Sequence, residues 1–248
     1  MRERGPSAAS WALRLLGVAI FGASAYVLFL VMTAPAALVA RVAPDLPEDA
    51  ALSGTIWHGA ALFRNGTRLA WDFDAAASVA SFAPVFAVEA SGDDTQLTGT
   101  AQADPLARPM AVTLRGVTGR AGWSLVEAVA PDVAIRCTPL ATVDIAAVTL
   151  RRDRSVYADG TLRSREGTCT APGVQAPVPV PPLLARIATD PAGNVRAVLT
   201  TQDAPDTTLA EARLDADALL TLTVQPEGAR RVPGLPTGFP IVLEMSLR

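Results

Sequence analysis

The chain has 248 residues, a formal net charge of −3 at pH 7, one histidine and two cysteines. This mildly acidic balance argues against a nucleic-acid partner, because such partners require clustered cations. The length suits one large domain or two small ones, and no change in composition along the chain forces a second domain.

The first predicted element is a helix in an uncharged run that Arg14 and Arg41 bracket. Its residues 15–34 are long enough to cross the hydrocarbon core of a membrane. Arginines dominate the N-terminal flank, so the positive-inside rule predicts residues 1–14 in the cytoplasm and the chain after Arg41 on the outer side. In a bacterium that side is the periplasm.

Two other interpretations of this run stay open. Ala34-Pro35-Ala36 resembles the cleavage site of a signal peptide, although the apolar run is long for that class. A buried helix of a soluble protein is the third interpretation. Retained anchor and signal peptide both export the same domain, so export is predicted by either.

Residues 35–51 are expected to be a linker, Pro-rich and acidic at its end, and residues 52–248 a β-rich domain. Leu52–Phe63 has the pattern of one strand, with Gly54 and Gly59 allowing close backbone approach on either side of a buried Trp57. Asn65-Gly66 predicts a type I′ hairpin turn, and residues 69–74 alternate as the return strand.

Later alternating segments predict strands at 84–90, 97–101, 110–114, 133–137, 145–150, 156–162, 195–201, 209–214, 218–224 and 240–247. Residues 123–129 have the spacing of a short helix, and 183–188 could form one or two helical turns. Residues 116–122 are expected to be a turn region, 151–155 a charged hairpin tip, and 175–182 polyproline-like chain. The fold class is therefore mainly β, an extended or curved antiparallel sheet with one or two short helices.

Cys137 and Cys169 are the only cysteines. In an oxidising compartment such a pair usually forms a disulfide; the alternative is two unpaired buried thiols. A metal site is not expected, because two thiols and one distant histidine cannot complete a tetrahedral shell.

Catalytic chemistry has few candidates in this sequence. His58 is the sole histidine, and its strand setting favours a surface position. Acid pairs such as Asp72 and Asp74 fit turns and the wet face of a strand better than glycoside chemistry. No nucleophile elbow, phosphate loop or dinucleotide motif is present. We therefore predict no catalytic, cofactor-binding or metal-binding residue, and no enzyme.

The order of these features resembles a known family. A basic N-terminus and one span precede L-x-G-T-x-W-x-G-A, from Leu52 through Gly54, Trp57 and Gly59 to Ala60, and then an L-x-W strand ending at Trp71. This is similar to the protein N family of the bacterial type II secretion system. A D-G-T-L turn at 159–162 and the Gly-Thr-Cys of 167–169 are similar to it as well.

The resemblance implies a non-enzymatic accessory subunit in the bacterial inner membrane, which supports export of folded proteins across the outer membrane. Its partners would be other inner-membrane secretion subunits. The runner-up is an AsmA-type envelope protein whose β-groove holds lipid, with residues 69, 71, 73, 110, 112 and 114 lining it. A periplasmic hydrolase is the third hypothesis and lacks a recognisable site.

Overall fold

The structure, a computed structural model of the full chain, describes residues 8–38, 50–104, 107, 111–129, 134–151, 156–173, 176–215, 219–232 and 235–246. Of residues 8–15, 129 and 246 it describes the backbone alone. Several predicted segments lie partly outside these ranges: residues 1–7 of the cytoplasmic segment (1–14), 39–49 of the linker, 152–155 of the hairpin tip and 175 of the polyproline-like segment. Residues 110, 133, 218, 247 and 248 lie outside them as well.

Thirteen strands form one antiparallel sheet in the order β1-β2-β3-β4-β5-β6-β8-β9-β12-β13-β14-β15-β16. Neighbours in the sheet follow one another along the chain, apart from two insertions that hold a second, three-stranded sheet (β11-β10-β7). The strands of the main sheet are β1 (Ala51–Gly54), β2 (His58–Leu62), β3 (Arg68–Phe73), β4 (Val85–Ser91), β5 (Gln96–Asp104), β6 (Ala111–Ala121), β8 (Ala141–Arg151), β9 (Val156–Ser164), β12 (Leu183–Thr189), β13 (Val195–Thr201), β14 (Thr208–Leu214), β15 (Leu219–Val224) and β16 (Ile241–Ser246).

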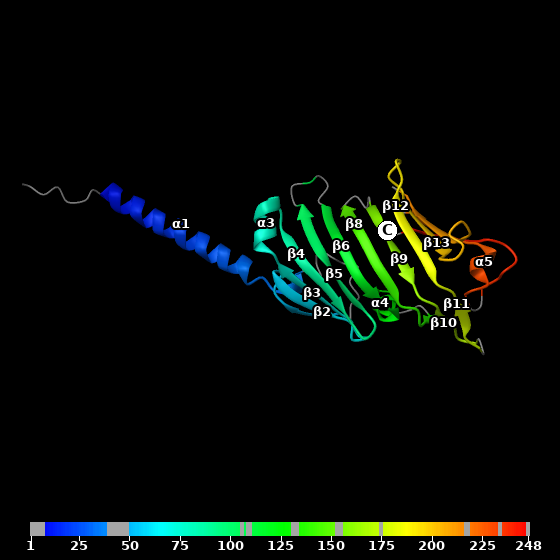
Figure 1. The fold of residues 1–248 in the computed structure, drawn as a ribbon. Coiled ribbons are helices and arrows are strands. Elements are labelled where there is room, and N and C mark those ends of the chain that lie inside the picture. Colours follow the sequence, from blue (N-terminus) through cyan, green and yellow to red (C-terminus); the bar gives the residue numbers. More distant parts are fainter. Residues whose placement is uncertain are drawn as a thin grey trace, which may run out of the picture.

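The small sheet consists of β7 (Arg136–Cys137), β10 (Gly167–Thr170) and β11 (Val178–Val180). The helices are α1 (Ala8–Met32), the 3-10 turn η1 (Ala36–Leu38), α3 (Ala75–Ser81), α4 (Trp123–Val129) and α5 (Pro226–Ala229). In Figure 1, α1 leads away from the β2–β3 end of the sheet, and the sheet bends round beyond β12 so that the last strands return behind it. The mainly β, curved antiparallel fold is confirmed.

One face of the sheet is apolar across its whole width. The cross-strand register joins one residue from every strand into a single row on this face: Leu52, Ala61, Leu69, Ala90, Leu97, Gly119, Val143, Leu162, Ala185, Leu199, Ala210, Val224 and Ile241. Because side chains alternate between faces with period two, Trp71 and Phe73, two and four positions beyond Leu69 on β3, share this face. We call this side the apolar face.

The next row belongs to the opposite side, and most of its residues are polar: Ser53, Ala60, Ala70, Glu89, Thr98, Thr118, Asp144, Thr161, Arg186, Val198, Glu211, Thr223 and Val242. We call this side the polar face. An antiparallel sheet with one apolar and one polar face is expected to cover the apolar side with something and to expose the other to water.

The sheet has little conventional core. Alanines make up more than half of the buried apolar residues among those described, including Ala60, Ala61 and Ala158. The accessible surface is 16310 Å², against about 10,000 Å² for a compact protein of this mass. Most residues of the apolar row are half-buried and only a few, such as Ala61 and Val143, are buried.

Several local predictions are wrong. Leu52–Phe63 is not one strand, because the chain reverses after Gly54 and pairs β1 with β2. The Asn65-Gly66 hairpin exists, but only Gly66 has positive φ there, so its turn is not type I′. Residues 116–122 are mostly strand: Gly116 and Gly119 adopt positive φ inside β6 without ending it.

The segment between the disulfide region and β13 also differs from its prediction. Val178–Val180 pairs with β10, and the expected helical turns at 183–188 are strand β12 between β9 and β13. The apolar residues of this segment satisfy either period over so short a run, and tertiary pairing decides between them. The short helix at 123–129, the 145–162 hairpin and the C-terminal strands are confirmed.

In the part of the chain that the structure describes, no helix has both the length and the apolar content of a membrane span. The span over residues 15–34 thus stays a prediction.

Candidate functional site

The sequence motif at residues 52–60 forms the end of β1, a tight turn and the start of β2. Gly54 pairs with Gly59 across β1 and β2, and the Thr55 backbone N–H donates to the His58 carbonyl over 2.9 Å. The Thr55 hydroxyl accepts from the backbone N–H groups of Trp57 (3.2 Å) and His58 (3.1 Å). Gly54 has φ +83°, which L side chains rarely adopt. The threonine and the first glycine therefore define the reversal.

Gly59 is required by a neighbouring ring. A Cβ at this position would overlap the Trp71 indole and lie 2.7 Å from the Thr55 carbonyl oxygen. Trp71 lies on β3, and its Nε1–H donates to the Ile56 carbonyl over 3.1 Å. The Gly-x-x-Trp-x-Gly spacing thus lets Trp71 cross over the turn and hydrogen-bond to it.

Trp57 joins this turn to the end of α1. Its Nε1–H donates to the Val31 carbonyl, one of the last in that helix, over 2.8 Å. The Ile56 N–H donates to the Ala34 carbonyl over 3.0 Å, and Pro35 forms a bridge with Thr55. We call these contacts the helix–sheet joint. Trp57 is half-buried rather than buried as predicted.

The chain after α1 begins to pack at once. Ala36 in η1 is 1% exposed, so residues 35–38 are part of the fold and not of a free linker. Aromatic contacts carry the joint further into the sheet: Trp57 meets Phe73 edge-on with ring centroids 5.1 Å apart, and Phe73 meets Phe86 at 5.6 Å. All five motif residues, Leu52, Gly54, Trp57, Gly59 and Trp71, therefore lie in one place.

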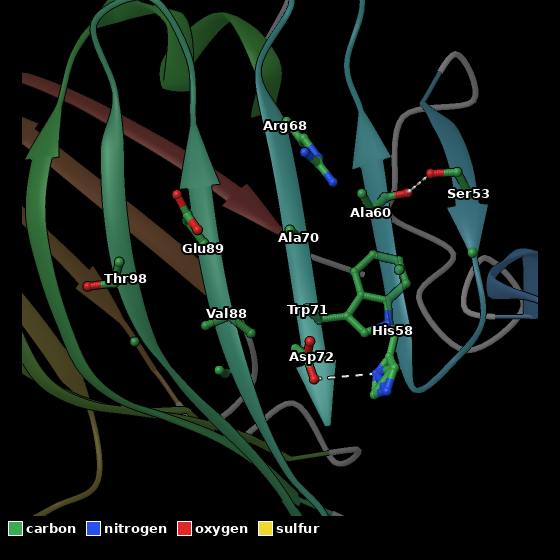
Figure 2. A pocket seen from close by; sticks show the side chains of 14 residues that line it. Ser53, His58, Ala60, Arg68, Ala70, Trp71, Asp72, Val88, Glu89 and Thr98 are labelled. Atoms are coloured by element: carbon green, nitrogen blue, oxygen red, sulfur yellow. Dashed lines mark hydrogen bonds and ion pairs between the residues drawn. The ribbon is translucent and has the colours of Figure 1, made fainter. Parts of the chain in front are cut away.

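A hollow of about 540 Å³ adjoins the joint. Figure 2 shows its side chains on β1 to β5, with Ser53, His58, Arg68, Asp72, Glu89 and Thr98 supplying the polar groups. His58 Nδ1 lies 3.4 Å from Asp72 Oδ1, and both side chains are more than half exposed. An ion pair this exposed contributes little to stability.

This hollow lacks the arrangement of a hydrolase. The same His58 Nδ1 is 2.9 Å from the Trp57 carbonyl, which holds the ring against its own backbone. The nearby Ser53 hydroxyl donates to the Ala60 carbonyl and not to the imidazole. The surface position predicted for His58 is confirmed, and the hollow offers mixed charge but no activated nucleophile.

A largely buried polar cluster joins the turn between β2 and β3, the turn between β4 and β5, and helix α4. The Asp94 carboxylate accepts from the Ser124 hydroxyl and, over 3.3 Å, from the Ser124 backbone N–H at the start of α4. The Thr95 hydroxyl and Asn65 amide join this network, the latter by donating to the Ser124 carbonyl. Thr67 and Thr95 are almost fully buried. The cluster therefore ties two hairpin turns to α4.

The pKa of Asp94 follows from these contacts. Partial burial acts to raise it, but the hydrogen bonds from Ser124, Thr95 and the Trp123 backbone outweigh burial and hold the pKa below its usual 3.8. At neutral pH the carboxylate is thus charged and accepts hydrogen bonds from Ser124 and Thr95. Its role is to hold this part of the fold together. Sequence reasoning noted the Asp93-Asp94 pair only as a turn.

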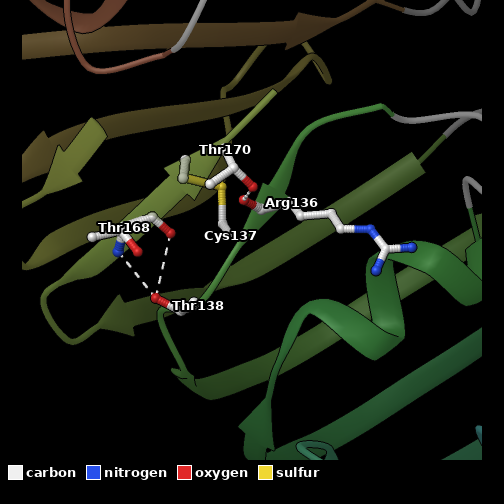
Figure 3. The surroundings of a disulfide bond; sticks show 6 residues. Arg136, Cys137, Thr138, Thr168 and Thr170 are labelled. Carbon is white, nitrogen blue, oxygen red and sulfur yellow. Dashed lines mark hydrogen bonds between the residues drawn. A yellow bond between two sulfur atoms is a disulfide. The ribbon is translucent and has the colours of Figure 1, made fainter. Parts of the chain in front are cut away.

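The predicted disulfide is present between Cys137 of β7 and Cys169 of β10, which face each other in the register (Figure 3). The Cα atoms are 4.1 Å apart. Next to it, the Thr138 N–H donates to the Thr168 carbonyl over 2.9 Å. The bond joins the insertion after β6 to the insertion after β9, away from the helix–sheet joint.

Within the described ranges, no group of three or more His, Cys, Asp or Glu side chains could hold a metal ion. No family model, no curated protein and no solved structure matches the chain. Its function must therefore be argued from the site and the sheet.

Proposed function

We propose that this chain is a non-enzymatic accessory subunit of the type II secretion system in the bacterial inner membrane, supporting export of folded proteins across the outer membrane. The observation that carries the proposal is the helix–sheet joint. Among the residues that resemble the protein N family, Trp57 hydrogen-bonds to the end of the apolar helix α1, and Gly54, Gly59 and Trp71 shape the turn that carries Trp57.

The proposed topology places residues 1–14 in the cytoplasm, a single span at 15–34 and the sheet in the periplasm. Large apolar side chains of α1 are exposed, for example Val18 at 70% and Phe21 at 76%. Such a surface favours a lipid environment. The disulfide favours an oxidising compartment for the sheet.

The partners in this proposal are other inner-membrane subunits of the secretion machine. A scaffold presents surface rather than chemistry, and the polar face offers charged rows for that purpose. Arg196 and Glu211, for example, pair through two hydrogen bonds of 2.6 and 2.8 Å on it. Such paired charges give a defined pattern that a partner can recognise.

The test is deletion of the gene, with quantitative proteomics of the culture medium and the periplasm. We expect folded proteins normally found in the medium to accumulate in the periplasm, and the intact gene to restore their release. An unchanged protein profile in the medium would reject the secretion role.

A second function is favoured by the apolar face. Its row of apolar residues crosses all thirteen strands without a polar side chain, which suits the AsmA-type alternative of a β-groove for lipid acyl chains. Lipid analysis of the purified protein tests it: phospholipid at a fixed ratio to protein favours the groove, whereas trace lipid that washes out rejects it.

A further inference from the structure

Helix α3 and the residue that follows it form an uncharged, exposed prong. Phe82 is 93% exposed and Val79 is 75% exposed. The helix itself has the sequence AAASVAS, with no charged residue. A surface helix normally presents charged or polar residues to water. Single exposed apolar residues are common, but here α3 and its C-cap Phe82 carry no polar side chain other than serine, and the charged group nearest to them in the chain is the N-cap Asp74.

Phe82 also has an unusual backbone. It is the C-cap of α3 with φ 52° and ψ 30°, the left-handed region, and no other described non-glycine residue has positive φ. Glycine is the usual residue at such a cap, because it has no Cβ penalty. The Phe82 backbone N–H caps α3, but its ring is almost fully exposed and adds little burial to the fold. A residue with this strained backbone and an exposed ring points to a function outside the fold.

A chain of contacts links the prong to the end of α1. The Val31 carbonyl bonds to Trp57, Trp57 packs on Phe73, and Asp74, the next residue, accepts from the Ala77 N–H to cap α3. In Figure 1, α3 lies level with the C-terminal end of α1, on the side of the sheet from which α1 leads away.

We propose that Val79 and Phe82 insert into the surface of the lipid bilayer next to the anchor, an inference that rests on the proposed membrane span. A helix that leaves the bilayer near Met32 places the membrane surface at the level of α3. Aromatic side chains favour that interface, and an uncharged helix face avoids the desolvation of charges there. The helix–sheet joint and the prong then hold the sheet at a fixed angle to the membrane.

The test uses the full chain in vesicles of phosphatidylethanolamine and phosphatidylglycerol. A single cysteine at position 80, 29 or 239 carries an environment-sensitive fluorophore; both native cysteines are in the disulfide and do not react. We expect labels at Phe29 and Ala80 to be quenched several-fold by lipid-borne nitroxides, and the label at Phe239 to stay in water.

The labels separate the two proposals. Quenching at Phe29 with none at Ala80 would overturn the prong and leave the anchor intact. No quenching at either position would reject the anchor and the prong together.

A variant then separates lipid contact from folding. Phe82→Gly removes the ring and suits the left-handed cap, so we expect an equal or higher melting temperature together with loss of quenching at Ala80. Phe239→Ser, an exposed phenylalanine elsewhere, should leave the quenching unchanged. A lower melting temperature with quenching retained would show that Phe82 has a structural role instead.

Discussion

At the scale of single residues, two glycines and two tryptophans shape the turn between β1 and β2, and one of them, Trp57, joins that turn to α1. The sequence shows that Gly54, Trp57, Gly59 and Trp71 are unusual and predicts close backbone approach. It does not show which group approaches, because the Trp71 ring comes from β3, twelve positions beyond Gly59. From the sequence, a contact between residues this far apart can be noticed only as an unusual spacing of glycines and tryptophans, which does not identify the partners.

Gly59→Ala should destabilise the protein by about 1–3 kcal/mol, because the added methyl overlaps the Trp71 ring and lies too close to the Thr55 carbonyl oxygen. Thermal unfolding measures the loss. Gly238→Ala is the matched control, since nothing lies within 4 Å of a Cβ there, and a change within about 0.5 kcal/mol is expected. Equal effects of the two variants would contradict the packing of Trp71 on Gly59.

Trp57→Phe should lower stability by about 0.5–1.5 kcal/mol, because it removes the hydrogen bond to Val31 while keeping an aromatic ring near Phe73. Amide exchange at Ile56 should quicken, since this N–H bonds to Ala34 in the same joint.

Trp123→Phe is the control for this change. The Trp123 Nε1 is buried and has no partner. Trp123→Phe removes this unpaired N–H group and should therefore leave the free energy of unfolding unchanged or raise it. An Ile56 amide that exchanges no faster in Trp57→Phe than in Trp123→Phe would show that Trp57 does not hold the end of α1.

At the scale of elements, the alternation of apolar and polar residues is a reliable predictor only where a strand has one wet face. The strands at 195–201 and 209–214 alternate clearly and were predicted nearly to the residue. The short strands β7, β10 and β11 and helix α3 carry too few residues for a period to emerge. Their positions depend on the disulfide and on Asp74. The sequence predicts the disulfide and a strand at 133–137 that ends in β7, but it does not predict β10, β11 or α3.

Loss of the disulfide should destabilise the protein without abolishing its fold. The bond closes a loop with a sequence separation of 32, which corresponds to about 3–4 kcal/mol in the chain-entropy model. The double variant Cys137→Ser/Cys169→Ser removes the cross-link and leaves no free thiol. Denaturant unfolding measures the resulting change in the free energy of unfolding. Mass mapping of the native chain without reductant should find the two peptides linked; free thiols there would contradict the bond.

The cluster at Asp94 predicts a dependence of stability on pH. Its pKa is lower in the folded state than the usual 3.8, so its contribution is fully present above that value and is lost as pH falls through the lowered folded pKa. Asp94→Asn should therefore melt at a lower temperature than the parent at pH 7, and the gap should narrow below pH 4.

Asp93→Asn is the control for the Asp94 variant, because the exposed Asp93 side chain makes none of these hydrogen bonds. Its melting temperature should follow that of the parent at every pH. A gap for Asp94→Asn that stays constant from pH 7 to pH 3 would show that the carboxylate's charge does not matter.

At the scale of the whole molecule, a curved sheet with one apolar and one polar face is joined to helix α1. The sequence predicts a curved antiparallel sheet from its strand count and composition. It does not reveal the continuous row on the apolar face, because that row depends on the register of each strand pair and on bulges such as those in β5–β6 and β8–β9. One shifted register would move a strand's apolar residues to the polar face.

The proposed topology is tested with reporter fusions after Ala50. A reporter enzyme that needs the periplasm should be active there, and one that needs the cytoplasm should be inactive, because the arginines of the N-terminal flank keep that end inside. Activity of the cytoplasmic reporter at this position would reverse the predicted orientation.

The central claim is that function resides in surfaces and in the joint that holds them, not in a polar group that performs chemistry. Secretion per amount of folded protein, measured in a deletion strain complemented with His58→Ala, with Asp72→Asn or with Trp57→Ala, tests this claim most directly. We predict that His58→Ala and Asp72→Asn leave both abundance and secretion nearly unchanged, and that Trp57→Ala lowers the two together. Loss of secretion in His58→Ala at unchanged abundance would contradict the claim and assign a chemical role to the histidine.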